Sequence, residues 1–125
     1  MNTDELMFGR TSEQIIGGAI AVANTLGCGF LETVYENALA HELRKAGLAV
    51  EQQCGVVVRY NDVVVGEYAV DLLVDHSVLV ELKAVRVLDD VHRAQCLNFL
   101  KATGLQLCLL INFGNPRLEF ERLVL

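Results

Sequence analysis

The spacing of apolar residues predicts two helices in the first third of the chain. Between residues 15 and 26, apolar side chains recur at intervals of three and four, which is the pattern of a helix with one buried face. Thr11, with Gln14 three residues later, resembles a capping box and predicts that this helix starts there. A second pattern of the same kind covers residues 31–46 and ends before a glycine.

The period changes in the middle third, where short runs rich in valine predict strands. Asn61 and Asp62 separate two of these runs, and Asp75, His76 and Ser77 separate two others, as expected for the turns of hairpins. We therefore expect an antiparallel sheet of three or four strands in this part of the chain, and the element order below assumes four. The runs are residues 56–58, 63–65, 68–74 and 78–85.

The last third of the chain returns to a helix and then to strands. Asp89 or Asp90 can cap a helix over residues 91–103. Residues 105–113 are almost wholly apolar and predict a buried strand, and residues 118–125 predict a weaker final one. The element order ααββββαββ indicates an α/β sandwich whose central strand is covered on both faces.

Length and composition predict one domain with apolar surface to spare. A chain of 125 residues can bury about two thirds of its unfolded surface, so we expect residues 1–125 to form one domain. Hydrophobic residues make up 53% of it, which is more than an average globular domain contains. The excess predicts a homodimer or a partner protein.

Charge and cysteine content limit the binding surfaces and the cellular location that we expect for this chain. The net charge of −6 argues against nucleic-acid binding through a broad basic surface. Residues 14–31 carry no charge, but their glycines and polar residues make the stretch too weakly apolar for a lipid-exposed helix. With no basic, apolar leader and no zinc or iron–sulfur spacing among the four cysteines, we expect a cytoplasmic chain with buried, reduced thiols.

Three charged residues stand out in the predicted hairpin. Asp71 lies on one apolar run, and Glu81 and Lys83 lie on the next. Residues two apart in a strand share a face, so Glu81 and Lys83 point the same way. An unpaired charge in such apolar surroundings costs roughly several kcal/mol, so a partner is expected, and a divalent cation is the obvious candidate.

The same residues carry a resemblance to a known family. Residues 29–35 read Gly-x-x-Glu-x-x-Tyr, and Asp71 is followed ten residues later by Glu81-Leu82-Lys83. In both features the chain resembles the GxxExxY proteins of the PD-(D/E)xK nuclease-like superfamily, and the resemblance extends over nearly the whole chain. Val70 stands where the superfamily name has proline. The resemblance implies a restriction-endonuclease-like fold, a central mixed sheet flanked by helices.

The chemistry of phosphodiester hydrolysis suits these side chains. It requires a metal that lowers the pKa of a water molecule and a cation that stabilises charge on the phosphoryl oxygens. Mg²⁺, or Mn²⁺ in its place, takes oxygen ligands and keeps several waters. We therefore expect Asp71 and Glu81 to be ligands, with the backbone carbonyl of Leu82 as a third. The resemblance implies that Lys83 holds the attacking water or stabilises the transition state.

Further site residues follow from the resemblance and from helix faces. The resemblance implies that Glu32 completes the metal site. Tyr35 shares its helix face and is a candidate substrate contact, although packing is the plainer role. On the third helix, His92 and Gln95 share a face. Gln95 is expected to orient water or phosphate, and His92 to contact the scissile phosphate or transfer a proton.

The leading hypothesis is a metal-dependent phosphodiesterase acting on nucleic acid, with DNA favoured. Two alternatives remain open: a nuclease-fold module with weak or no turnover that docks to a partner protein, and a hydrolase of a small phosphorylated molecule. A strand with these three charged residues can also be a surface salt-bridge ladder. Arg86, Arg93 and Lys101 could touch a nucleic-acid backbone or lie on a solvated face. The sequence shows no aromatic platform for stacking single-stranded bases.

Overall fold

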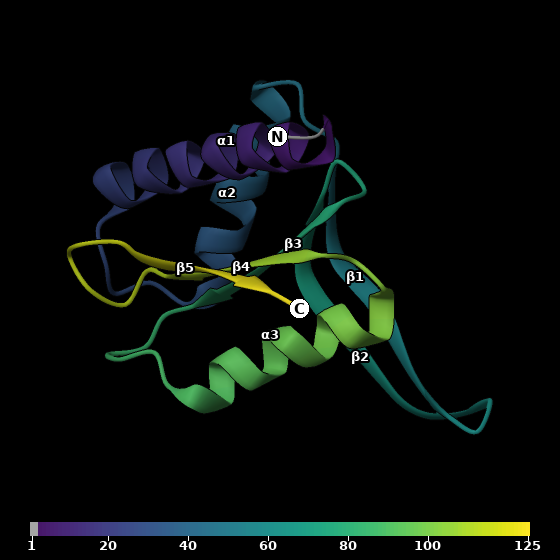
Figure 1. Cartoon of the computed structure of the whole chain (residues 1–125). Coiled ribbons are helices and arrows are strands. Elements are labelled where there is room, and N and C mark those ends of the chain that lie inside the picture. Colours follow the sequence, from purple (N-terminus) through teal and green to yellow (C-terminus); the bar gives the residue numbers. More distant parts are fainter. Residues whose placement is uncertain (1–2) are drawn as a thin grey trace.

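A five-stranded sheet lies between two helices on one face and a third helix on the other (Figure 1). The computed structural model describes the backbone of residues 3–125 and the side chains of residues 9–125. Its elements are α1 (Thr3–Leu26), α2 (Glu32–Lys45), β1 (Val50–Tyr60), β2 (Val63–Val74), β3 (Val78–Lys83), α3 (Asp90–Thr103), β4 (Leu107–Asn112) and β5 (Glu119–Val124).

The sheet is mixed, as expected. Its strands lie in chain order, and all neighbours are antiparallel except β3 and β4, which run parallel and are joined through α3. Helices α1 and α2 cover one face and α3 covers the other (Figure 1). Every residue of β4 is buried, as is every residue of β3 before Lys83. The prediction of an α/β sandwich with a covered central strand is confirmed.

The expected order ααββββαββ is wrong by one strand. The apolar runs at residues 63–65 and 68–74 belong to a single strand, β2, so the order is ααβββαββ. Gly66 lies between the two runs, but it keeps its place in the ladder opposite Val58 on β1. Because the neighbouring strand continues past it, a residue that weakens an isolated strand does not end this one.

The expected start of the first helix is also wrong. α1 begins at Thr3, so Thr11 lies inside the helix and its side chain is buried. A capping side chain satisfies N–H groups that have no helical acceptor, whereas the residues after Thr11 already follow two helical turns. Among the helices that the structure describes, α1 included, none is long and apolar enough to cross a membrane.

Cysteine burial differs from the expectation for two of the four residues. Cys96 and Cys108 are buried in the core beneath α3, in agreement with the prediction. Cys28 is exposed in the connection between α1 and α2, and Cys54 on β1 is half-buried. All four are free thiols. Cys28 lies in a loop and Cys54 on the edge strand β1, and neither thiol belongs to the buried core.

The parallel strands β3 and β4 are tied together beyond their carboxyl ends. The buried Asn112 side chain accepts a hydrogen bond from the Val85 N–H at 3.0 Å and donates one to the Val85 carbonyl at 2.8 Å. The Phe113 N–H donates to the Lys83 carbonyl at 2.8 Å. These contacts hold the segment after Lys83 against the end of β4. These hydrogen bonds therefore fix the position of the end of β3, where Lys83 lies.

Gly114 allows this close approach. A Cβ atom at Gly114 would lie 2.0 Å from the Val85 carbonyl oxygen, a backbone atom that cannot rotate away. We predict that Gly114→Ala lowers the free energy of unfolding by about 1–3 kcal/mol or more, because the two chain segments must separate. Urea denaturation followed by circular dichroism measures this. The control is Gly55→Ala on β1, where a Cβ meets nothing within 4 Å. Equal losses in the two variants would contradict the prediction.

Candidate functional site

β2 changes the face that it presents to the core at Asp71. Val70 packs into the cluster beneath α3, whereas Leu72 packs into the cluster beneath α1 and α2. Residues two apart in a regular strand share a face, so the side-chain direction switches between them. On β1, Gln53 lies across from Asp71 but has no pairing partner on β2, and its φ is 52°. Irregular ladders of this kind re-aim side chains, and they recur next to active sites.

The ladder between β2 and β3 also stops at this point. Its last backbone pair joins Leu72 and Val80. Beyond it, carboxylates replace backbone carbonyls as acceptors. The Asp71 N–H donates to Glu81 Oε1 at 3.0 Å, and the Leu82 N–H donates to Asp71 Oδ2 at 2.8 Å. The two acids therefore lie side by side where the strands separate.

Glu81 is a buried acid with an altered proton affinity. Its side chain is only 4% exposed, and burial raises its pKa from 4.5 to about 7. The charge of Asp71 also raises this pKa and that of Glu32 adds a smaller increase, whereas the Asp71 N–H and the charge of Lys83 lower it. Since burial is the largest cause, the charged form of Glu81 lacks the hydration that stabilises an exposed carboxylate.

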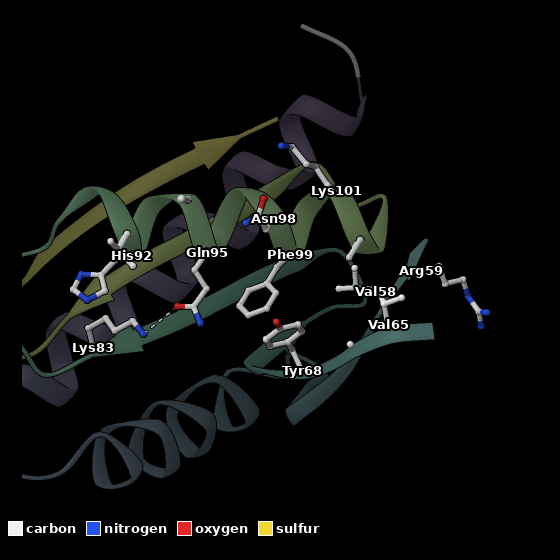
Figure 2. Close-up of a pocket in the computed structure, with 14 residues that line it drawn as sticks. Val58, Arg59, Val65, Tyr68, Lys83, His92, Gln95, Asn98, Phe99 and Lys101 are labelled. Atoms are coloured by element: carbon white, nitrogen blue, oxygen red, sulfur yellow. Dashed lines mark hydrogen bonds between the residues drawn. The ribbon is translucent and has the colours of Figure 1, made fainter. Parts of the chain in front are cut away.

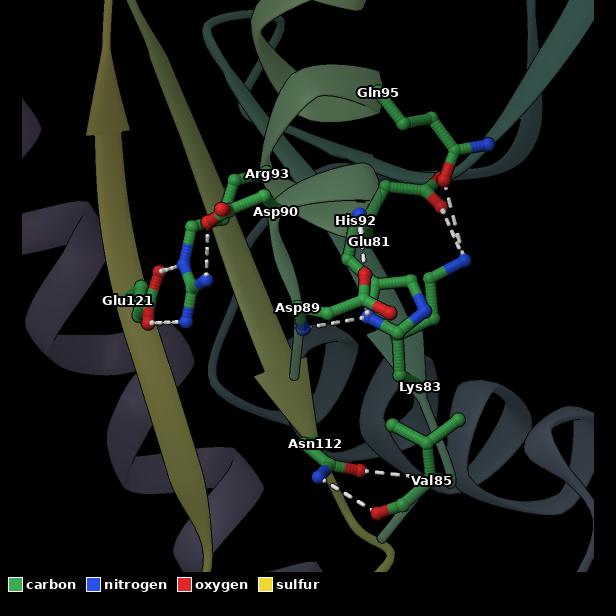
Figure 3. Close-up of polar contacts among 10 residues, drawn as sticks. All are labelled: Glu81, Lys83, Val85, Asp89, Asp90, His92, Arg93, Gln95, Asn112 and Glu121. Atoms are coloured by element: carbon green, nitrogen blue, oxygen red, sulfur yellow. Dashed lines mark hydrogen bonds and ion pairs between the residues drawn. The ribbon is translucent and has the colours of Figure 1, made fainter. Parts of the chain in front are cut away.

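Lys83 and Gln95 meet beside the acids. Lys83 Nζ donates to Gln95 Oε1 at 3.2 Å and lies 3.9 Å from Glu81 Oε2 (Figures 2 and 3). The lysine reaches from the end of β3, and the glutamine from the first half of α3. Asp71, Glu81, Lys83 and Gln95 thus gather at one place, although they come from three elements. The ammonium group is held between a carboxylate and an amide oxygen.

Glu32 approaches the site from the first turn of α2. Its Oε1 accepts a hydrogen bond from the Ala84 N–H at 3.3 Å, one residue beyond Lys83. It is near enough to Glu81 to raise the pKa of that acid. Among the residues whose side chains are described, however, no three His, Cys, Asp or Glu residues form a cluster close enough to hold a metal ion. The two strand acids are the close pair.

Sequence reasoning missed a second layer of contacts behind Asp71. The buried Glu36 accepts hydrogen bonds from Gln52 Nε2 at 2.8 Å and from Gln53 Nε2 at 2.6 Å. Gln53 Nε2 also donates to Asp71 Oδ1 at 3.2 Å. The helix position of Glu36, four residues after Glu32, gave a hint that the two acids share a face. Nothing in the sequence pointed to Gln53, whose role depends on its position across from Asp71.

The expectation that Tyr35 contacts substrate is wrong. Its side chain is fully buried and stacks on Phe113 at a centroid distance of 4.6 Å. Its hydroxyl donates to the Gly27 carbonyl at 2.7 Å and accepts from the Phe30 N–H at 3.2 Å. A buried side chain with these partners is not available to a ligand. Instead, the hydrogen bonds of Tyr35 hold the loop that leads into α2 and so help to position Glu32.

His92 forms part of the cap of α3. The Asp89 N–H donates to His92 Nδ1 at 3.2 Å, and the His92 N–H donates to Asp89 Oδ1 at 3.2 Å (Figure 3). Next along the helix, Arg93 forms a two-pronged pair with Glu121 at 2.7 and 2.8 Å. The Arg93 guanidinium group is therefore already paired and is not free to contact a nucleic-acid backbone, the role that its position in the sequence suggested.

Lys83 and Gln95 open onto a groove of about 860 Å³ between α3 and the β1–β2 hairpin. His92 also lines this groove near Lys83 (Figure 2). A substrate that occupied it would have the lysine at one end. Lys83 and Gln95 can therefore be reached from the groove, whereas Asp71 and Glu81 are not part of its lining.

Comparison with known proteins adds a family match. The model of the PD-(D/E)XK nuclease superfamily matches residues 9–123. A search of curated proteins found no match to this sequence.

Two solved structures share the fold. The crystal structure of SSO0001 is similar with a TM-score of 0.57 and 17% identity, over 94% of this chain and 58% of that one. An alkaline exonuclease (LHK-Exo) from Laribacter hongkongensis is similar with a TM-score of 0.52 and 14% identity, over 91% of this chain and 82% of that one. This chain thus spans less than two thirds of SSO0001. These likenesses agree with the expected restriction-endonuclease-like fold.

The raised pKa of Glu81 predicts a pH-dependent stability in the metal-free protein. Between pH 4.5 and about 7 the folded state binds more protons than the unfolded state, so stability falls as pH rises through this window. The loss is at most about 3 kcal/mol. Glu81→Gln removes this titration, and we expect it to be more stable than the parent at pH 8 but not at pH 4.

Urea denaturation in EDTA across this pH range is the measurement. Glu13→Gln, an exposed position on α1, serves as the control and should follow the parent. If the parent and Glu81→Gln show the same dependence on pH, the assigned proton affinity is incorrect.

Proposed function

Because the chain belongs to the PD-(D/E)XK nuclease superfamily, we propose that it is a metal-dependent phosphodiesterase that cleaves nucleic acid, with DNA as the favoured substrate. The observation that carries this proposal is the meeting of Asp71, Glu81 and Lys83 where β2 and β3 separate. Two acids beside an ammonium group supply ligands for a metal and a positive charge for a phosphate.

The donor set suits a hard divalent cation. Asp71 and Glu81 would hold Mg²⁺ or Mn²⁺ through carboxylate oxygens, with the Leu82 carbonyl and Glu32 as further ligands. When bound, such a cation would polarise a phosphoryl oxygen and lower the pKa of a water molecule. The buried Glu81 supports this fit, because its neighbours include two other acids and a single ammonium group.

Lys83 and Gln95 would act on the substrate side. The Lys83 ammonium group is a compact donor of three hydrogen bonds, of which one reaches Gln95 Oε1. The remaining N–H groups can hold a water or stabilise charge that develops on phosphoryl oxygens. Since Gln95 uses its carbonyl oxygen for the lysine, its amide N–H groups remain to orient phosphate or water. His92 is the candidate for a further phosphate contact.

A binding module without turnover is the second candidate. Two observations favour it: the lack of a three-acid cluster among the described side chains, and apolar exposure on the β1–β2 hairpin. Tyr60 is 70% exposed there, and Val63 and Val65 are each 61% exposed. Such a surface suits a protein partner or a second copy of this chain. Dimer formation remains a prediction.

We predict that purified protein cleaves labelled DNA in Mg²⁺ or Mn²⁺, and that Lys83→Ala lowers kcat by about 10²–10³-fold, the usual effect of removing one transition-state donor. Parallel RNA substrates decide between the two nucleic acids. Lys45→Ala is the control, because this lysine lies on α2 and pairs with Glu42. Cleavage that survives Lys83→Ala unchanged would remove the assignment, and an absence of cleavage on every substrate would favour the binding module.

Calorimetry tests metal binding without reference to turnover. We predict that the protein takes up Mn²⁺ with a measurable isotherm that Asp71→Asn weakens by about tenfold or more, because a ligand charge is lost. Asp62→Asn, in the exposed turn between β1 and β2, should bind as the parent does. If Asp71→Asn and the parent give the same isotherm, the metal is held elsewhere.

A further inference from the structure

The groove beside Lys83 continues well past the candidate catalytic residues. It runs between α3 and the β1–β2 hairpin, with Lys83, His92 and Gln95 near one end and Arg59 beyond the other (Figure 2). Along α3 it extends from His92 to Lys101, which corresponds to a rise of roughly 14 Å. One phosphate cannot contact cations at both ends of such a length, whereas a polymer with repeated phosphates can.

The charge of the groove is opposite to that of the whole chain. Its described lining contains three cations, Arg59, Lys83 and Lys101, and no aspartate or glutamate. The chain as a whole has 16 acidic against 10 basic residues. Among the described side chains, neither Arg59 nor Lys101 forms an ion pair. The lining is therefore complementary to an anion.

An aromatic platform lies between the cations. Tyr68 on β2 is 56% exposed, and its ring meets the buried Phe99 of α3 edge-on, with centroids 6.1 Å apart (Figure 2). A Cβ at Gly66 would lie 3.2 Å from the Tyr68 ring, so the glycine leaves room for it. The sequence showed no such platform, because these two aromatic residues lie 31 positions apart and meet only in the folded chain.

We propose that this groove binds an unpaired nucleic-acid strand, with a base stacked on Tyr68 and the backbone running from Lys83 toward Arg59 and Lys101. The inference rests on the proposed nuclease function and names the form of its substrate. A base within a duplex is already stacked on both faces, so only an unstacked base can use the exposed ring. Stacking also provides affinity without a broad basic surface, which this acidic chain lacks.

Binding is tested in EDTA, which removes the divalent metal that the proposed cleavage requires, so that the parent protein keeps Lys83 and all three groove cations. The probes are a fluorescein-labelled oligothymidylate and a duplex of equal length, followed by anisotropy. We expect the single strand to bind more tightly than the duplex, and Tyr68→Ala to weaken its binding by about 5- to 150-fold. Tyr68→Phe should retain the affinity. The control is Tyr60→Ala, since Tyr60 is exposed on the same hairpin but does not line the groove.

A second measurement reports stacking directly and applies even if Tyr68→Ala does not fold. The chain contains no tryptophan, so Tyr68→Trp introduces a single indole reporter. Its emission should be quenched as oligothymidylate is added, whereas Tyr60→Trp should show no quenching.

A third measurement concerns the phosphate contacts. Arg59→Gln should reduce the slope of log Kd against log salt concentration by about 0.7, the value for one phosphate contact on a single strand.

The outcomes separate this inference from the proposed function. Tight duplex binding, a Tyr68→Ala variant that binds as its parent does, or an equal loss in Tyr60→Ala would each overturn the stacked single strand while leaving cleavage intact. Conversely, cleavage can fail in Mg²⁺ while Tyr68-dependent binding persists in EDTA. In that case the groove assignment stands and the proposed hydrolysis does not.

Discussion

The structure depends on the separation of β2 and β3 at Asp71 and Glu81. Up to Leu72 the two strands pair through their backbones, and beyond it the carboxylates accept the N–H groups that the ladder leaves free. A buried N–H group without a partner is costly, so these acids are structural as well as chemical groups. Lys83 lies just beyond this separation, at the end of β3, and reaches toward Gln95 on α3. The same carboxylate oxygens therefore stabilise the fold and take part in the proposed chemistry.

Several contacts keep this opening in place. Gln53 links Asp71 to the buried Glu36, and Asn112 ties the segment after Lys83 to the end of β4. On the opposite side, Gln95 holds the lysine ammonium group. Each contact joins a different element to the site, so the geometry is fixed by the fold as a whole. Preorganised charge of this kind is the main way in which proteins stabilise transition states.

Acidity of the whole chain and cationic character of one groove are compatible. Net charge describes the average surface, whereas binding depends on the few side chains that line a site. Here the strand acids lie at the opening of the sheet, and the groove beyond them is lined by cations and one exposed aromatic ring. With only three cations in its lining, the groove suits stacking better than broad electrostatic attachment.

The sequence alone determined the layers of the fold and the residues at the centre of the site. Apolar periodicity fixed the helices and most strands, because burial of one face is a local requirement, and the spacing from Asp71 to Lys83 placed both strand acids and the lysine on neighbouring strands. Tertiary structure decided the rest. It joined two runs into β2, enclosed Tyr35 in the core, and brought Gln53 to Asp71. It also paired Tyr68 with Phe99. These outcomes depend on which residues the folded chain sets side by side, and no local pattern encodes contacts between distant segments.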